Sequence, residues 1–226
     1  MLECAAVRHR AWASVLVSLL LTTAGCVSAR RTELQRPAGP ERAGAAMQDL
    51  LRVSPGADLP QQVNVIVEIP KGSLNKYEFN AKQRVIELDR VLGGTERYPV
   101  EYGFVPQTLM PDGDPLDFVM PVTEPTHPGV LVEARPIGVM RMLDQGAVDD
   151  KIVCVPVKDP RFQGIDTLEG LPLGQRDVLS RFFSSYKDPE GKSTSVPGFG
   201  DVEEAHRLIR AAHEAYVGAD QESEAR

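Results

Sequence analysis

The chain has 226 residues, of which 42% are hydrophobic and 25% charged, so it has the composition of a globular protein and enough length for a substantial core. Its formal net charge of −7 argues against nucleic-acid binding, because proteins that bind phosphate backbones usually present a basic face. Its three cysteines are too few for a small fold held together by disulfides.

Residues 1–25 have the layout of a secretory signal peptide. Arg8 and Arg10 precede an apolar run over residues 11–21, which is short for a membrane span, and small residues then lead to Cys26. The ending resembles a bacterial lipobox, which implies lipidation of Cys26 and an extracytoplasmic, membrane-anchored lipoprotein. An uncleaved anchor is one alternative. A cytoplasmic enzyme whose translation starts further along, for example at Met47, is the other.

The middle of the chain predicts a tether followed by many short strands. Residues 26–60 lack sustained periodicity and are interpreted as a flexible tether, with a short helical turn over 47–53. Alternating apolar residues predict a strand over 63–69. Further strand-like runs, separated by turn residues, cover 76–79, 85–90, 118–122, 130–134, 138–143 and 151–157. Cys154 lies in one of these runs and is expected to be buried and inert.

The last third predicts two helices. Apolar residues at helical spacing over 178–186 indicate the first. The second is expected to begin near Asp201, with Glu204 at the spacing of a capping box. We therefore expect a mainly β fold with C-terminal helices (α+β), in which a small closed OB-like β-barrel is flanked by about two helices. The folded domain is predicted over 61–217, and a frayed polar tail over 218–226.

Three carboxylates lie close together in a Gly/Pro turn just before an apolar strand. They are Asp112, Asp114 and Asp117, and such hard oxygen ligands suit Mg²⁺, Mn²⁺ or Ca²⁺ rather than zinc. An EF-hand loop is excluded, because Asp117 occupies the position of its required glycine and Thr123 that of its glutamate. The remaining alternative is a solvated acidic turn.

A second acidic cluster favours a metal site over that alternative. Asp144, Asp149 and Asp150 follow the predicted strand over 138–143, and Lys151 opens the next strand. Two Asp-rich strand tips on one small barrel indicate a site for several metal ions rather than two unrelated turns.

From about residue 58 to about residue 216 the chain resembles the soluble (type I) inorganic pyrophosphatases. The most specific part of the resemblance is Asp-Gly-Asp-Pro-Leu-Asp at 112–117. Around it stand, in the family's order, Val-Glu-Ile-Pro (67–70), Lys-Tyr-Glu (76–78), Leu-Asp-Arg (88–90), Tyr-Pro-Val-Glu-Tyr-Gly-Phe (98–104), Arg-Pro-Ile-Gly-Val (135–139), Asp-Asp-Lys (149–151) and Tyr-Lys-Asp (186–188). The departures are Phe118, where a smaller aliphatic residue is usual, and the signal peptide, since most relatives are cytosolic.

The resemblance assigns a role to each matched position. It implies metal ligands at Asp112, Asp117, Asp144 and Asp149, with Glu68 and Glu78 at further acidic positions of the site. It places substrate-binding groups at Lys76, Arg90, Tyr102, Lys151, Tyr186 and Lys187, with Tyr98 close by. Asp114 matches the carboxylate beside the attacking water, and Asp114, Asp117, Lys76 and Arg90 are the expected catalytic residues.

Several of these residues also have a purely structural interpretation. Glu68 and Glu78 could face outward from a strand, and Arg90 could simply pair with Asp89. Tyr102 could be a core residue of the barrel, as Tyr186 could be of the helix.

The implied activity is hydrolysis of pyrophosphate to two phosphates by a metal-activated water, with several Mg²⁺ per active site and Mn²⁺ as a substitute. The resemblance also implies a homo-oligomer. From the charge we expect no binding of nucleic acid, and from the N-terminal signal we expect contact with the membrane only through the lipid anchor. The alternatives are hydrolysis of other phosphoanhydrides such as tripolyphosphate and a non-catalytic lipoprotein that binds metal or phosphate. A nucleic-acid-binding OB barrel is disfavoured by the charge and by an aromatic content of only 6%.

Overall fold

The computed structural model of the protein describes residues 49–224. The predicted signal peptide, the lipidation site Cys26 and most of the predicted tether lie outside these residues.

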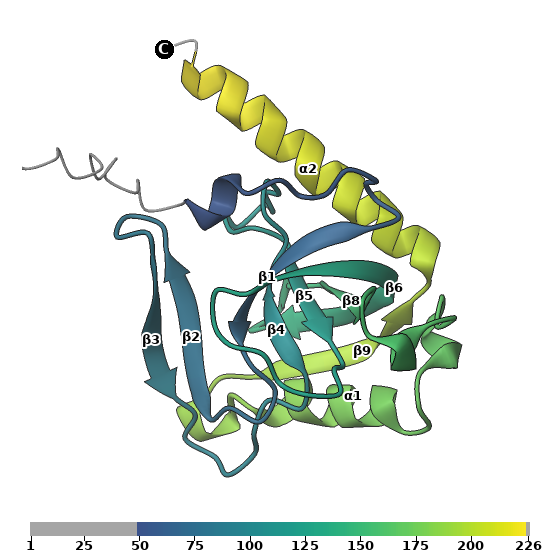
Figure 1. Cartoon of the computed structure of the whole chain (residues 1–226). Helices are drawn as coiled ribbons and strands as arrows, with labels where there is room; N and C mark the ends of the chain where they lie inside the picture. The colour runs from purple at the N-terminus through teal and green to yellow at the C-terminus, as the bar shows by residue number, and fades with distance from the viewer. Residues whose placement is uncertain (1–48, 225–226) are drawn as a thin grey trace, which may run out of the picture. The chain divides into compact units, whose positions relative to one another are not determined.

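The centre of the fold is a closed ring of strands (Figure 1). The ring consists, in hydrogen-bonding order, of β1 (Val63–Ile69), β4 (Glu101–Phe104), β5 (Asp117–Met120), β8 (Lys151–Pro156) and β6 (Leu131–Asp144), and β6 pairs back with β1. All its pairings are antiparallel except the one between β5 and β8. The short strand β7 (Ala147–Val148) and the strand β9 (Thr194–Gly200) pair with β6 outside the ring. The expected mainly β fold is confirmed, and the ring corresponds to its small closed barrel.

β6 joins two runs that the sequence separates. The runs over 130–134 and 138–143 are one strand, which pairs with β1 near its start and with β8 and β9 further along. Pro136 lacks an amide hydrogen and therefore looks like a break in the sequence. In the structure the register shifts between Pro136 and Gly138, so a bulge bends the strand around the ring instead of ending it.

Both faces of the ring strand β8 are buried, and each face packs against a different helix. In β8, Ile152 and Cys154 pack with residues of α2 (Val202–Glu224), whereas Val153 packs with residues of α1 (Gln175–Ser185). β8 consequently reads as a continuous apolar run, as strands covered on both faces do. Cys154 is buried as expected, and burial raises the pKa of its thiol.

The two helices confirm the expected C-terminal pair, with one correction. The Asp201 carboxylate caps α2 by accepting a hydrogen bond from the Glu204 amide at 2.8 Å. The predicted frayed tail is wrong for residues 218–224, because α2 continues to Glu224. Alanine, glutamine and glutamate favour helix and follow a single glycine there. No helix in the described part of the chain is both long and apolar enough to cross a membrane.

Beside the ring stands a separate two-stranded sheet (Figure 1). It is the hairpin of β2 (Asn75–Asn80) and β3 (Val85–Val91), and both strands lie where the sequence predicts them. The hairpin is tied to β1 by a hydrogen bond from the Phe79 amide to the Glu68 carboxylate at 2.7 Å. Because the hairpin carries Lys76 and Arg90, its attachment to the ring decides where these two cations lie.

Four short 3-10 helices complete the described chain, namely η1 (Leu50–Arg52), η2 (Pro160–Phe162), η3 (Leu168–Gly170) and η4 (Asp188–Glu190). η1 confirms the short helical turn expected over 47–53. Its Leu51 carbonyl accepts a hydrogen bond from the Gln107 amide at 2.9 Å, and the Pro55 carbonyl accepts one from Asn64 at 2.8 Å. Residues 49–60 therefore belong to the folded unit, and the predicted tether boundary at residue 60 lies too far along the chain.

Candidate active site

The predicted site residues converge on one cavity of about 1010 Å³. The segments that line it come from β1, β2, β4, the turn before β5, the β6–β8 connection and the end of α1. The predicted residues in its wall are Glu68, Lys76, Glu78, Tyr102, Asp112, Asp114, Asp117, Asp144, Asp149, Tyr186 and Lys187. Lys151 joins this set through hydrogen bonds to Asp117 and Asp149, whereas Arg90 lies outside the wall and bonds to Asp89, which also contacts Lys76.

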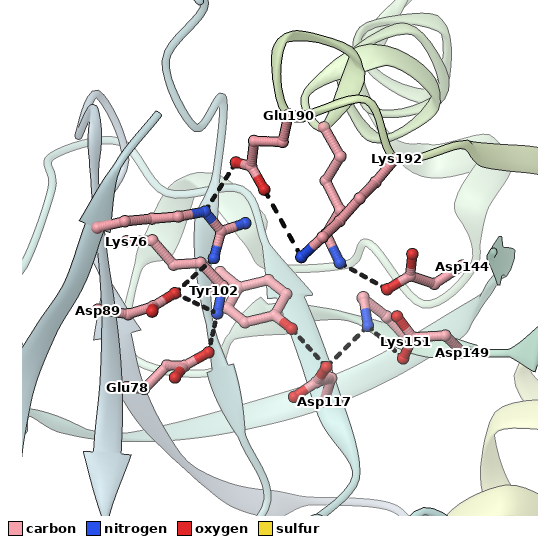
Figure 2. A network of polar contacts seen from close by, with 12 residues as sticks. Lys76, Glu78, Asp89, Tyr102, Asp117, Asp144, Asp149, Lys151, Glu190 and Lys192 are labelled. Carbon is pink, nitrogen blue, oxygen red and sulfur yellow. Dashed lines mark hydrogen bonds and ion pairs between the residues drawn. The ribbon is translucent and has the colours of Figure 1, made fainter. Parts of the chain in front are cut away.

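At the floor of the cluster, Lys151 bridges two aspartates (Figure 2). Its ammonium group lies 2.7 Å from Asp117 and 2.8 Å from Asp149, and its side chain is only 1% exposed. The parallel register of β5 and β8, which pairs Phe118 with Ile152, places Asp117 beside Lys151. Burial works against the charge on Lys151, but the two carboxylates outweigh it and raise the pKa of the lysine.

Tyr102 contacts the same aspartate from the neighbouring strand. Its hydroxyl donates a hydrogen bond to Asp117, and its ring lies 5.5 Å from the Lys151 ammonium. Burial is the main reason why the pKa of Tyr102 is raised well above its usual range. The hydroxyl therefore keeps its proton and remains a hydrogen-bond donor at neutral pH.

The acidic turn before β5 is held by its own backbone. Gly113 has a φ of +96°, a conformation that L side chains rarely adopt, and its amide donates to the Met110 carbonyl at 3.0 Å. The Asp112 carboxylate accepts a hydrogen bond from the Asp114 amide at 3.1 Å. Partial burial, together with the nearby Asp112 and Asp117, raises the pKa of Asp114.

Asp144 at the end of β6 meets Lys187, which follows α1. The Lys187 ammonium lies 2.5 Å from one carboxylate oxygen of Asp144, and 5.4 Å from the ring centroid of Tyr186. The other carboxylate oxygen of Asp144 is buried and has no hydrogen-bond partner among the described residues. A buried, unpaired carboxylate oxygen is costly, so this atom is available for a cation.

The two glutamates differ in environment. Glu68 is 8% exposed, although a polar residue in a strand usually faces solvent, so the outward interpretation of Glu68 is wrong. Burial, together with the nearby Asp117, raises the pKa of Glu68 to about 8. Glu78 is 51% exposed and pairs with Lys76.

On the hairpin, carboxylates surround two cations. Lys76 contacts Glu78 and also Asp89, the latter at 3.2 Å, and burial lowers the pKa of this lysine. Arg90 pairs with Asp89, as its structural interpretation expects, and in addition with Glu190 at 2.7 Å. No local pattern in the sequence marks Glu190 as a site residue, because it lies 100 residues from Arg90.

An aromatic cluster fixes the tyrosines of the cavity wall. Tyr98, which is almost fully buried, packs against Phe182 of α1 with ring centroids 5.0 Å apart, and against Tyr102 at 5.9 Å. Tyr186 packs on Phe182 at 5.3 Å. The rings of Tyr102 and Tyr186 therefore pack in the core, as their structural interpretation expects. The same packing places both residues in the wall of the cavity.

The donor set fits hard divalent cations. In the cavity wall, acidic residues outnumber the ammonium groups of Lys76 and Lys187; they are Glu68, Glu78, Asp112, Asp114, Asp117, Asp144, Asp149 and Asp150. All of these donors are oxygens, as Mg²⁺ prefers, and one oxygen of Asp144 is unpaired. Among the described residues, no three acidic, His or Cys side chains are arranged to hold one ion, and Asp117, Asp149 and Asp144 pair with lysines instead.

Comparison with known proteins gives one consistent result. The family model of inorganic pyrophosphatase matches residues 65–217. The chain is 43% identical to an inorganic pyrophosphatase of Halalkalibacterium halodurans over 70% of this chain and 98% of that protein. It is 44% identical to one of a Nostoc species over 74% and 99% of the two chains. The crystal structure of inorganic pyrophosphatase from Thermus thermophilus superposes with a TM-score of 0.72 at 38% identity, covering 75% of this chain and 99% of that one.

Proposed function

The chain belongs to the inorganic pyrophosphatase family and is an inorganic diphosphatase, and we propose that it hydrolyses pyrophosphate to two phosphates in the cavity described above. One observation carries this assignment of the site: acidic residues and cations from separate elements meet in one cavity, in the positions that the family motifs predict.

We assign the metal-binding role to the aspartates of the cavity. Asp112, Asp117, Asp144 and Asp149 would hold Mg²⁺, or Mn²⁺ as a substitute, and Glu68 and Glu78 complete the acidic wall. When bound, such ions neutralise phosphoryl oxygens and acidify water near neutral pH. Lys151, buried between Asp117 and Asp149, keeps both carboxylates facing the cavity.

The cations and tyrosines act on the substrate itself. Pyrophosphate is highly charged, and Lys76, Arg90 and Lys187 supply positive groups that orient it and stabilise charge on the leaving phosphate. The hydroxyls of Tyr102 and Tyr186 keep their protons because burial raises the pKa of both residues, so each can donate a hydrogen bond to a phosphate oxygen.

Asp114 is assigned to the attacking water. It lies in the same wall as Asp117, and its raised pKa makes it a better proton acceptor than an ordinary aspartate. It would accept a hydrogen bond from the water and steer it toward phosphorus.

Phosphate release from pyrophosphate, with MgCl₂ or with EDTA, tests the assignment. Wild type should release phosphate only with the divalent ion, and Asp117→Asn should lose about a hundredfold or more in turnover, as expected when a central catalytic carboxylate is removed. Asp166→Asn is the matched control, because Asp166 is 71% exposed, pairs with Arg135 at 3.0 Å and lies outside the cavity wall. Wild-type turnover in Asp117→Asn would refute the role given to Asp117.

The choice among phosphoanhydrides is tested with the same assay. We expect pyrophosphate to be preferred, with tripolyphosphate cleaved more slowly because its additional negative charge must be placed in a cavity whose wall is rich in acidic residues. A larger kcat/KM for tripolyphosphate would favour the alternative.

For the N-terminal segment we propose removal of residues 1–25, lipidation of Cys26 and an extracytoplasmic location, which the arrangement of charged, apolar and small residues supports. Mass spectrometry of the expressed protein's N-terminus is the test. A lipid-modified Cys26 is expected, whereas an N-terminus at Met1 or Met47 would point to the cytoplasm.

The homo-oligomer implied by the family is tested separately, by light scattering of the purified protein.

A further inference from the structure

The three guanidinium nitrogens of Arg90 have unequal environments. Nε donates to Glu190 at 2.7 Å, and Nη1 donates to Asp89. Nη2 is buried and has no hydrogen-bond partner among residues 49–224. A buried donor without a partner is costly, whereas the other two nitrogens of the same group are satisfied. The two carboxylates therefore hold the planar guanidinium in one orientation, in which Nη2 alone of its three nitrogens has no partner among residues 49–224.

Glu190 is itself fixed in place. It ends η4, a short turn in which the Glu190 amide donates to the Lys187 carbonyl at 2.9 Å and Gly191 donates to Asp188 at 2.9 Å. The Glu190 side chain is only 19% exposed, and its second oxygen lies 3.9 Å from Lys192 (Figure 2). A rigid turn thus presents this carboxylate to the arginine.

The same contact joins two segments that carry residues of the cavity wall, the β2–β3 hairpin with Lys76 and the turn that follows Lys187. Among the ion pairs of the described residues, Arg90–Glu190 is the one that links the β2–β3 hairpin to another element. η4 begins directly after Lys187, which lies against Asp144. The pair therefore sets the position of the hairpin cations relative to Lys187.

We propose that Glu190 is a positioning residue of the diphosphatase reaction, an inference that rests on the proposed function. Glu190 holds Nε of Arg90 and thereby fixes the orientation of the guanidinium that acts on the substrate, and it keeps the hairpin against the segment that carries Lys187. Asp89 supports the same guanidinium from the other side. Because arginine stays charged at all relevant pH values, the role of Glu190 is orientation rather than control of a proton.

The test compares Glu190→Ala and Glu190→Gln with wild type in MgCl₂. Glu190→Ala removes the acceptor that holds Nε, so kcat/KM should fall about tenfold or more. Glu190→Gln can still accept a hydrogen bond from Nε and should recover part of that loss. The melting temperatures of the two variants should be similar, so that a difference in kcat/KM between them reports the orientation of Arg90 rather than loss of the fold.

Glu169→Ala is the matched control. Glu169 also lies on a 3-10 helix and pairs with an arginine, Arg176 at 3.4 Å, but its side chain is 73% exposed and its partner is not one of the predicted site residues. This control removes the same charge and should keep the wild-type kcat/KM. An equal loss in both variants would show a general charge effect and would overturn the proposal.

A double-mutant cycle with Arg90→Lys shows whether Glu190 acts through Arg90. Lysine lacks the planar guanidinium that Glu190 orients. Adding Glu190→Ala to the Arg90→Lys variant should therefore lower kcat/KM by a much smaller factor than Glu190→Ala does in wild type. Fully additive losses would overturn the proposal. If wild type hydrolyses pyrophosphate and Glu190→Ala keeps the same kcat/KM, the positioning role of Glu190 is refuted and the proposed function stands. If wild type does not hydrolyse pyrophosphate, the proposed function itself is refuted.

Discussion

A single buried carboxyl, Glu68, makes the stability of the metal-free protein depend on pH. Its pKa is about 8 in the folded chain against 4.5 as the ordinary value, because burial favours the neutral form. The folded state therefore binds the proton more tightly than the unfolded state. The stabilising effect is fully present below about pH 4.5 and is lost as the pH rises through about 8.

We therefore expect wild type to lose stability relative to Glu68→Gln across this window. In EDTA, the difference in unfolding free energy between the two proteins should shift by up to about 1.4 kcal/mol per pH unit, in favour of the variant as the pH rises. Urea unfolding at pH 5, 6.5 and 8 measures it. A difference that does not change with pH would contradict the raised pKa.

At this scale the sequence predicts which residues come together around one cavity but not the partners of these residues. Ordered motifs locate Asp112, Asp117 and Lys151, because each motif is local in the chain. Glu190 and the burial of Glu68 could not be predicted, since each depends on segments that meet only in three dimensions. The contact between Glu190 and Arg90 spans 100 residues.

At the scale of elements, one glycine allows the close crossing of β1 and β4. A Cβ at Gly103 would lie 2.0 Å from the Ile66 carbonyl oxygen and 2.8 Å from the Glu68 amide nitrogen, both backbone atoms of β1. The neighbours of Gly103 in β4 are Tyr102 and Phe104, and Phe104 pairs with Asp117. The separation of these strands therefore also sets the geometry of the cavity floor.

Gly103→Ala should force β1 and β4 apart, because backbone atoms cannot rotate away. We expect a loss of about 3 kcal/mol or more in unfolding free energy, the upper end for overpacking, together with lower diphosphatase activity. Urea unfolding and phosphate release measure the two effects. Unchanged stability would refute the close approach.

Gly218→Ala is the opposite case. Gly218 lies in α2, and a Cβ at this position would point into open space, so alanine meets no obstacle. Alanine has the higher helix propensity, and the variant should gain about 0.5–1 kcal/mol in unfolding free energy. Urea unfolding measures the gain. A loss of stability would show that α2 does not extend this far.

Most strands could be predicted from alternation and turn residues, and the exceptions have physical reasons. β4 has only four residues, and β9 contains Pro197 and Gly198, which sequence rules assign to turns. The sequence divides β6 at Pro136 because a bulge within a strand leaves the same signal as a break.

At the scale of the whole molecule, the metal-free fold concentrates acidic groups in one cavity. Like charges in a partly buried site repel one another, and a ligand that binds only the folded state stabilises it by mass action. Adding MgCl₂ at about a hundred times its Kd should raise the unfolding free energy by about 2.7 kcal/mol. Thermal unfolding with MgCl₂ and with EDTA measures this, and Asp117→Asn should show a smaller difference. An equal difference in both proteins would contradict the ligand role of Asp117.

The separate hairpin has a consequence for how such a protein can change over generations. Lys76 and Arg90 stand on a sheet of only two strands, neither of which contributes a buried residue to the two core clusters. Substitutions in β2 and β3 can therefore alter affinity for one anhydride over another while the ring stays intact. Under selection for a new polyphosphate substrate, the first substitutions should therefore appear in the hairpin. Mutant libraries limited to residues 75–91 should contain a larger number of soluble variants with a changed substrate preference than libraries directed at the ring.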